Sequence, residues 1–242
     1  MFIKICGITN IHDAQIACDL GASALGFVFA ESNRQVTARQ TAAIVKGVPQ
    51  HIETVGVFVN EPLENLKTII NKSKITAVQL HGQETNQYIS ALADIIAECN
   101  PIPHSKKESG PRKGIKIIKT LKIGRGHKDH SDQTTTPGNH ADRTLQFKQA
   151  PGKKGSIWKY LVEPHVKGVD GGSGKGFDWQ AIKNLNLADI IVAGGIKPAN
   201  IHSLLNQIQP FGIDLSSGVE KSPGVKDEFL MKMLFKNILS TG

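Results

Sequence analysis

Short apolar segments alternate with longer amphipathic segments along most of this chain. The short ones span three to six residues and are rich in β-branched residues, which is typical of buried strands, whereas the longer ones repeat apolar residues at helical spacing. This alternation predicts consecutive strand-helix units, an α/β fold with a parallel sheet. The eight expected strands are Ile3–Ile5, Ala24–Phe29, Thr54–Val59, Ala77–Leu80, Lys116–Thr120, Tyr160–Val162, Ile190–Ala193 and Gly212–Leu215.

Helices are expected between these strands. Asn10 and Thr37 stand at the predicted beginnings of two of them, where their side chains would cap the first turn. Eight units in 242 residues suit a single-domain (β/α)8 barrel over residues 1–242, since such barrels commonly have about 250 residues. The expected helices are Ile11–Leu20, Arg39–Lys46, Leu63–Asn71, Thr85–Ala97, Trp179–Leu185, Lys197–Gln207 and Asp227–Ser240.

Two polar segments around the fifth expected strand, 103–114 and 124–155, interrupt this pattern. They are poor in core-forming residues, so we expect mobile surface insertions. The charge of the chain is concentrated there, because His104 to Lys154 holds thirteen Lys or Arg against four Asp or Glu, a local +9 within an overall +8. Phe147 is the only aromatic residue of that stretch, so stacking on nucleic acid is not supported and no nucleic-acid partner is expected. The irregular histidine spacing of these segments predicts no metal site.

The cysteines and the hydropathy indicate the compartment. Cys6, Cys18 and Cys99 are scattered without CxxC spacing, which favours a reducing, cytoplasmic environment. No apolar run approaches the ~18 residues that span a bilayer, so no membrane association is expected.

Reactive and anion-binding residue types stand at the predicted carboxyl ends of the strands, the active face of such barrels. Cys6 ends the first strand and is followed by a glycine. Two consecutive strand ends carry small residues whose backbone N–H groups can approach an anion, which indicates a phosphate site after strands seven and eight. Those residues are Gly194, Gly195, Ser216 and Ser217.

Further polar side chains complete the candidate site. Arg34 follows the second strand and presents a planar fork suited to a carboxylate. Gln79 and Asp214 lie near the ends of strands four and eight, and His81 is interpreted as structural. A carboxyl group opposite Cys6 would provide the acid for proton-transfer chemistry. Glu163 is the preferred candidate for that acid, and Asp170 is the alternative.

The motifs taken together resemble phosphoribosylanthranilate isomerase of tryptophan biosynthesis. They are KICGIT, GFVF followed by SNRQV, VGVFVN, VQLHG, GGSGKGFDW, AGGI-x-P-x-N and DLSSGVE-x-x-PG-x-KD. The likeness covers most of residues 1–100 and 156–240. It implies a (β/α)8 barrel that converts N-(5-phosphoribosyl)anthranilate to 1-(2-carboxyphenylamino)-1-deoxyribulose 5-phosphate by an Amadori rearrangement, without metal or organic cofactor.

The resemblance also implies roles for single residues. An acid opens the ribose ring, and Cys6 then removes the C2 proton from the Schiff base. Arg34 holds the anthranilate carboxylate, Asp214 lies near the substrate, and Gly194, Gly195, Ser216 and Ser217 bind the phosphate. Where the family usually has an aspartate as the acid, this chain has Glu163, one methylene longer.

Two other functions remain open at this point. One is an inactive relative that uses the basic insertion to bind an acidic partner or nucleic acid, although the retention of Cys6, Arg34 and Asp214 argues against it. Another phosphate-binding barrel enzyme, such as indole-glycerol-phosphate synthase, would need catalytic lysines, for which Lys4 and Lys119 are the only candidates at the strand ends. Both monomers and homodimers of such a barrel are reasonable.

Overall fold

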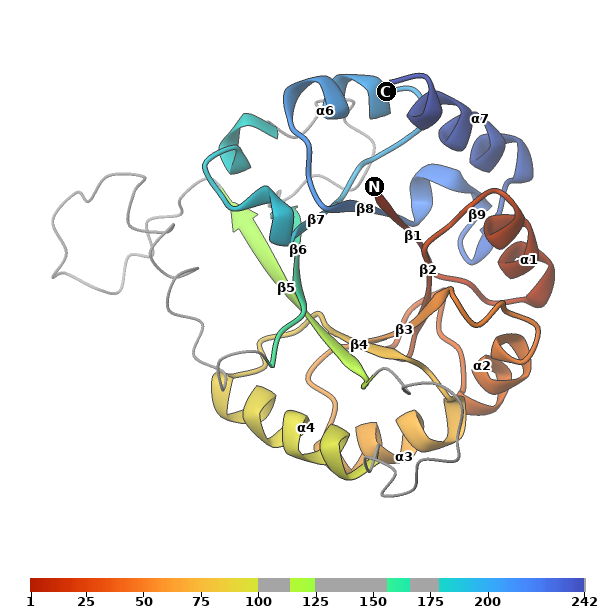
Figure 1. Ribbon diagram of the computed structural model, residues 1–242. Coiled ribbons are helices and arrows are strands. Elements are labelled where there is room, and N and C mark those ends of the chain that lie inside the picture. Colours follow the sequence, from red (N-terminus) through yellow and green to blue (C-terminus); the bar gives the residue numbers. More distant parts are fainter. Residues whose placement is uncertain (100–113, 125–155, 166–178, 242) are drawn as a thin grey trace, which may run out of the picture.

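Eight parallel strands close into a barrel in sequence order in the computed structural model, which describes residues 1–99, 114–124, 156–165 and 179–241 (Figure 1). Each strand pairs with the next, and β8 pairs with β1. The predicted (β/α)8 fold is therefore confirmed. The strands are β1 (Phe2–Cys6), β2 (Ala24–Val28), β3 (Glu53–Phe58), β4 (Ala77–Leu80), β5 (Lys116–Gly124), β6 (Lys159–His165), β7 (Ile190–Ala193) and β8 (Gly212–Leu215).

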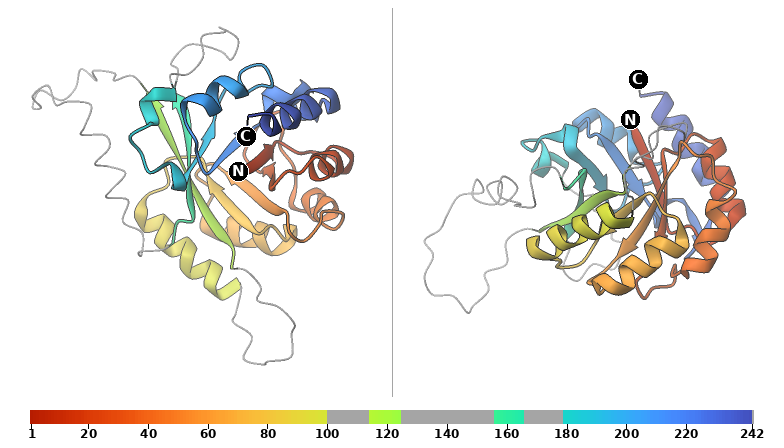
Figure 2. Two further views of the ribbon diagram at one scale, coloured as in Figure 1. Left: turned by 45° about the horizontal axis from the view of Figure 1, so that its top comes forward. Right: turned by 60° about the horizontal axis from the view of Figure 1, so that its bottom comes forward.

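Helices surround the ring of strands on the outside (Figures 1 and 2). A short antiparallel pair, β9 (Glu220–Ser222) and β10 (Val225–Lys226), follows β8. The helices are α1 (Ile11–Asp19), α2 (Ala38–Val45), α3 (Leu63–Ser73), α4 (Asn86–Cys99), α6 (Ile201–Gln207) and α7 (Glu228–Leu239), with 3-10 turns η1 (Trp179–Ile182), η2 (Leu187–Asp189) and η3 (Ser217–Val219).

Side-chain capping fixes where α1 and α2 begin. The Asn10 side chain accepts a hydrogen bond from the backbone N–H of Asp13, and Thr37 forms a capping box with Gln40, as the sequence predicted. Two other helices differ from expectation. The segment from Trp179 is a 3-10 turn rather than an α-helix, and α6 begins four residues later than expected. The Asn200 side chain bonds the backbone of Lys197 and Gly195, which replaces the first helical turn.

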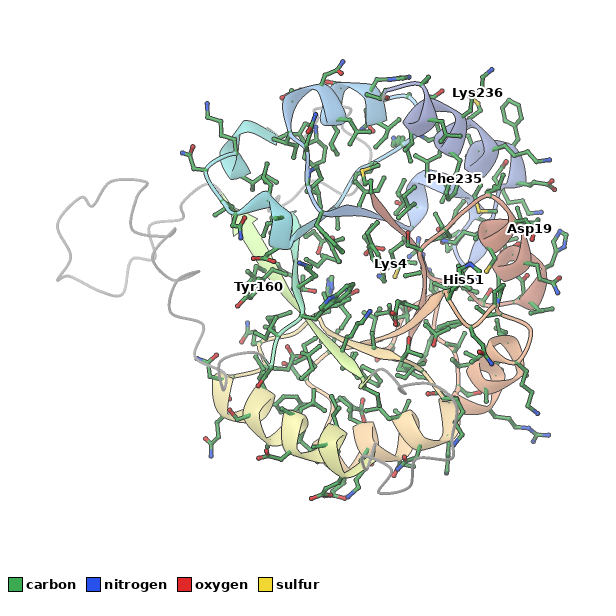
Figure 3. The ribbon with its side chains drawn as sticks, in the orientation of Figure 1. Lys4, Asp19, His51, Tyr160, Phe235 and Lys236 are labelled. Carbon is green, nitrogen blue, oxygen red and sulfur yellow. The ribbon has the colours of Figure 1, made fainter. Side chains whose placement is uncertain are left out.

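Strand alternation divides the core into an outer and an inner part. On β1, Ile3 and Ile5 face outward and pack in one large cluster with helix residues such as Ala14, whereas Lys4 lies within the ring (Figure 3). A second cluster fills the barrel interior with Ala24, Val55, Ala77, Ile118, Leu161, Ile191 and Ala193.

Three aromatic rings close the amino end of the barrel. Phe2 packs against Phe211 and Trp158 with ring centroids 5.4 and 5.6 Å apart, and Trp158 meets Phe211 at 5.6 Å. The polar interior residues therefore lie toward the carboxyl ends of the strands, which is where barrels of this architecture carry their sites.

The predicted polar insertions 103–114 and 124–155 lie almost wholly outside the described residues, as do Asp170 and the glycine-rich stretch 171–176. No helix among the described residues is both long and apolar enough to traverse a bilayer. Cys6 and Cys18 are free thiols.

Candidate active site at the carboxyl ends of the strands

Cys6 lies at the end of β1 beside a buried ion pair. The Lys4 ammonium, fully buried, is 2.9 Å from the Asp214 carboxylate of β8 and also interacts with the Cys6 thiol. Gly26 of β2 is the register partner of Cys6 and provides the space for that thiol, since a Cβ on Gly26 would stand 2.6 Å from Sγ. Cys6, Lys4 and Asp214 thus form one contact group.

The surroundings of Cys6 act on its proton in opposite directions. Burial and the Asp214 charge raise the pKa of the thiol, whereas Lys4 and Lys226 lower it, and the net shift is upward. Burial would lower the pKa of Lys4, but Asp214 and Cys6 raise it above its usual value. The raised pKa values keep Lys4 charged and favour the protonated thiol of Cys6 in the resting site.

Glu163 lies in β6, two residues before its last residue His165, where it faces the barrel mouth and pairs with His81. Its Oε2 is 3.2 Å from His81 Nε2, and its side chain is 33% exposed. Nδ1 on the other edge of the His81 ring lies 3.1 Å from Gln79 Nε2 and 3.2 Å from Thr120 Oγ1. The hydrogen bond from His81 is the main cause that lowers the pKa of Glu163, burial opposes it, and Lys122 and Lys4 add to the lowering.

Arg34, in the loop after β2, forms an ion pair with Glu220, which follows β8. Glu220 accepts from Arg34 Nε at 3.0 Å and from Nη2 at 2.7 Å, a bidentate pair. Lys226 Nζ lies 2.7 Å from the same carboxylate and also donates to the backbone carbonyls of Cys6 and Ser216. This network joins the loop after β2 to the end of β1 and to the loop after β8.

Gly7 connects Cys6 to these groups. Its φ is +77°, and a Cβ there would stand 2.7 Å from Arg34 Cδ and 3.0 Å from Ser216 Oγ. A side chain at this position would separate Arg34 from the loop after β8.

The loops after β7 and β8 lie side by side, because Ala193 and Asp214 are paired at the ends of these strands. Gly194 and Gly195 have φ of 88° and 66°, and a Cβ on Gly195 would meet no atom within 4 Å. Ser217 is exposed and Ser216 half-buried. The backbone here is thus open to an approaching anion.

The structure brings most of the predicted residues to the same end of the barrel. Cys6, Glu163 and Gln79 line its mouth, Asp214 is engaged by Lys4, and Arg34 is engaged by Glu220. Glu220 and Lys226 were not singled out as site residues, although both stand in the DLSSGVE-x-x-PG-x-KD stretch. Lys4 and Lys119, the two lysines considered for a synthase, are ion-paired with Asp214 and Glu84.

No group of three or more metal-ligating side chains stands among the described residues. The arrangement instead joins a thiol, a carboxyl group, a guanidinium and an open glycine-rich backbone. Such a set can transfer protons to and from a substrate that carries a phosphate and a carboxylate.

Comparison with known proteins agrees with this chemistry. The family model described as N-(5'phosphoribosyl)anthranilate (PRA) isomerase matches residues 3–109 and 130–237. The N-(5'-phosphoribosyl)anthranilate isomerase of Oceanobacillus iheyensis is 34% identical and covers 98% of this chain and 97% of its own.

Solved structures extend the likeness to the whole barrel. The phosphoribosyl anthranilate isomerase of Thermotoga maritima has a TM-score of 0.74 at 30% identity, and the match covers 99% of each chain. A phosphoribosyl anthranilate isomerase in complex with reduced 1-(o-carboxyphenylamino)-1-deoxyribulose 5-phosphate has a TM-score of 0.71 at 28% identity, again over 99% of each chain.

Proposed function

Because this chain belongs to the N-(5'-phosphoribosyl)anthranilate isomerase family, we propose that Cys6 and Glu163 are the base and the acid of its reaction. The family carries out an isomerisation in tryptophan biosynthesis. The observation that carries the proposal is that both side chains face the mouth of one barrel, with the Lys4 charge acting on each of them.

Glu163 starts the reaction as the acid. It gives a proton to the ring oxygen of the ribose, the bond from C1 to that oxygen breaks, and the nitrogen lone pair forms the C=N bond of a cationic Schiff base. Proton transfer by a positioned carboxyl group is general acid catalysis. Because its side chain is one third exposed, Glu163 is accessible to a substrate in the mouth.

Cys6 then acts as the base. The Cys6 thiol first loses its proton to solvent at the mouth, the thiolate then takes the C2 proton, the C–H electrons form a C1=C2 bond, and the nitrogen recovers its lone pair. The enol loses its hydroxyl proton and C1 gains one, which gives the ketone. The cationic Schiff base adds a positive charge to those of Lys4 and Lys226, and together they lower the pKa of Cys6 when the base is needed.

Arg34 binds the anthranilate carboxylate with its outer edge. Glu220 occupies Nε–H and one Nη2 hydrogen, which leaves the Nη1 and remaining Nη2 hydrogens as a second fork. Glu220 fixes the direction of that fork, since a paired guanidinium has little rotational freedom.

The phosphate and the ribose use the remaining predicted residues. Gly194, Gly195, Ser216 and Ser217 hold the phosphate through backbone N–H groups and hydroxyls on the adjoining loops after β7 and β8. Gln79 and Asp214 lie on inward-facing strand positions, where Gln79 contacts His81 and Asp214 is paired with Lys4, and contribute to substrate binding from there.

The ligand of the site is thus a small molecule and needs no bound metal or organic cofactor in this mechanism. We further propose a cytoplasmic protein, on the scattered free cysteines. A dimeric phosphoribosylanthranilate isomerase converted to monomers has also been solved at 28% identity to this chain, so both states are compatible with the fold.

Steady-state isomerisation of freshly generated phosphoribosylanthranilate, followed by loss of its fluorescence, tests these assignments. Cys6→Ala and Glu163→Gln should each lose at least a hundredfold in kcat. The control is Cys18→Ala, which removes a thiol on α1, outside the barrel, and should keep full activity. If Cys6→Ala retains its kcat, Cys6 is not the base. Retention in Glu163→Gln, with loss in Asp170→Asn, would move the acid to Asp170.

A further inference from the structure

Glu163 faces a conflict between its role and its surroundings. An acid must carry a proton when the substrate binds, yet the pKa of Glu163 is lowered, first of all by His81. A carboxyl group that is ionised in the resting site needs a donor that protonates it before it can act as an acid. His81 is the residue in contact with its Oε2.

The pocket around His81 fixes the ring from its other edge. Gln79 and Thr120, 2% and 5% exposed, approach Nδ1, while Nε2 points at Glu163. His81 continues the inward alternation of β4 beyond its end, because its backbone N–H still donates to the Phe58 carbonyl of β3. The ring is therefore oriented by strands on both sides rather than by a free loop.

The hydrogen-bonding groups around His81 can accommodate its ring with both nitrogens protonated. With Nε2 of Gln79 turned to the ring, Nδ1 accepts and Nε2 of His81 carries the hydrogen that Glu163 receives. In this arrangement the buried Oε1 of Gln79 has no partner. A half-turn of the amide brings Oε1 to Nδ1, which must then be an N–H donor. Both ring nitrogens then donate, so the pocket provides an acceptor for each N–H of the imidazolium, Gln79 Oε1 at Nδ1 and Glu163 Oε2 at Nε2.

We propose that His81 is a positioning residue that supplies the proton Glu163 delivers to the ribose ring oxygen. This rests on the proposed role of Glu163 as the acid. The imidazolium Nε2–H passes its proton to Glu163 Oε2, the Glu163 O–H passes one to the ring oxygen, and the C1–O bond breaks. The enol hydroxyl returns a proton to the pair when it becomes the ketone. Histidine suits this exchange, because imidazole gains and loses a proton close to neutral pH.

The charged groups that face Glu163 and His81 determine how the protonation of this pair depends on pH. Lys122 of β5 is the register partner of Glu163, and Lys4 of β1 acts on Glu163 from across the barrel. Asp214 of β8 offsets Lys4. Lys119 of β5 is occupied by Glu84 at 2.6 Å. Lys122 and Lys4 favour the ionised carboxylate of Glu163, so we expect activity to fall on the basic side of the profile as the pair of Glu163 and His81 loses its proton.

The pH profile of kcat tests the proposal. His81→Ala should lower kcat roughly a hundredfold at neutral pH, displace the basic limb of the profile to lower pH, and recover at least tenfold with added imidazole. The matched control is His51→Ala, which replaces an exposed histidine in the loop before β3 and should keep the parent profile. Urea unfolding of both variants establishes that His81→Ala is folded.

Each outcome decides between the two assignments. If Glu163→Gln is inactive but His81→Ala keeps the parent kcat and basic limb, the proposal for His81 is wrong, whereas the assignment of Glu163 as the acid is retained. If His81→Ala loses kcat with an unshifted profile and no imidazole recovery, its role is structural and the proposal is also wrong. If Glu163→Gln remains active, the acid assignment itself fails.

Discussion

Glu220 binds both N–H groups of one edge of Arg34, with Nε 3.0 Å from Oε1 and Nη2 2.7 Å from Oε2. The same carboxylate holds Lys226, whose side chain is fully buried. Burial alone would raise the pKa of Glu220, but Arg34 and Lys226 lower it overall, so the carboxylate is charged at neutral pH.

Glu220→Gln therefore tests how Arg34 is oriented. The amide keeps the shape but supplies only one acceptor oxygen, so the guanidinium loses its bidentate partner. We expect KM for phosphoribosylanthranilate to rise about tenfold with kcat changed less than threefold, because the carboxylate clamp acts on bound substrate and transition state alike. Glu228→Gln, an exposed residue paired with Lys232, is the control and should leave KM unchanged. A fall in kcat alone would contradict the expectation.

Gly26→Ala tests the space that β2 leaves for the thiol. The new methyl would stand 2.6 Å from Cys6 Sγ and 3.0 Å from Lys4 Cε, so one of these side chains must move. We expect kcat to fall about a hundredfold through misplacement of the thiol, with about 1–3 kcal/mol lost in stability.

Gly114→Ala is the matched control for this substitution, because a Cβ there meets no atom within 4 Å. Kinetics well below the melting temperature, together with urea unfolding, separate the two effects. An unchanged kcat in Gly26→Ala would show that Cys6 does not depend on its present position.

Lys4→Met measures the pairing of Lys4 with Asp214. The substitution leaves the carboxylate, whose side chain is 9% exposed, without its partner. Removal of one member of a buried ion pair costs about 3–5 kcal/mol. Replacing both members, as Lys4→Met with Asp214→Leu, should recover most of that stability but no activity. Lys232→Met, which breaks an exposed pair, should cost under about 1 kcal/mol. Equal losses at both sites would contradict the prediction.

Glu84→Gln tests acid stability at the loop after β4. Burial would raise the pKa of Glu84, but Lys119 and the backbone N–H of Asn60 lower it overall. A folded pKa below the unfolded value of about 4.3 gives stability that is present above that pH and lost as the pH falls through the folded pKa. Glu84→Gln should therefore be less stable near neutral pH and lose less on acidification. Urea unfolding from about pH 3 to 7 measures this, and parallel curves would contradict it.

The alternation of short apolar runs with amphipathic segments predicted the barrel well, because a parallel strand covered on both faces needs a nearly continuous apolar run. β4, β7 and β8 have the bounds expected from the sequence. Helix beginnings were predicted where a side chain caps the backbone, as at Asn10, and missed where a side chain replaces the first turn, as at Asn200. These competing local bonds are close in energy, so the residue type alone does not decide between them.

The pairings of the site were beyond sequence reasoning for a different reason. Lys4 and Asp214 are 210 positions apart, and Arg34 and Glu220 are 186 apart, so their contact depends on the register with which the barrel closes. His81 was interpreted as structural because the end of its strand was uncertain, and the alternation proves to continue through it. Gly26 carried a signal that was not used, since glycine within a strand often marks a close approach.

The packing of Phe2, Trp158 and Phe211 at the amino end of the barrel determines how substrate enters and product leaves. These rings block the amino end of the barrel, so phosphoribosylanthranilate and the ketose formed from it pass the same carboxyl-end mouth. Entry of one requires that the other has left. Accumulating product therefore competes with substrate for the free enzyme, and its release is part of every turnover.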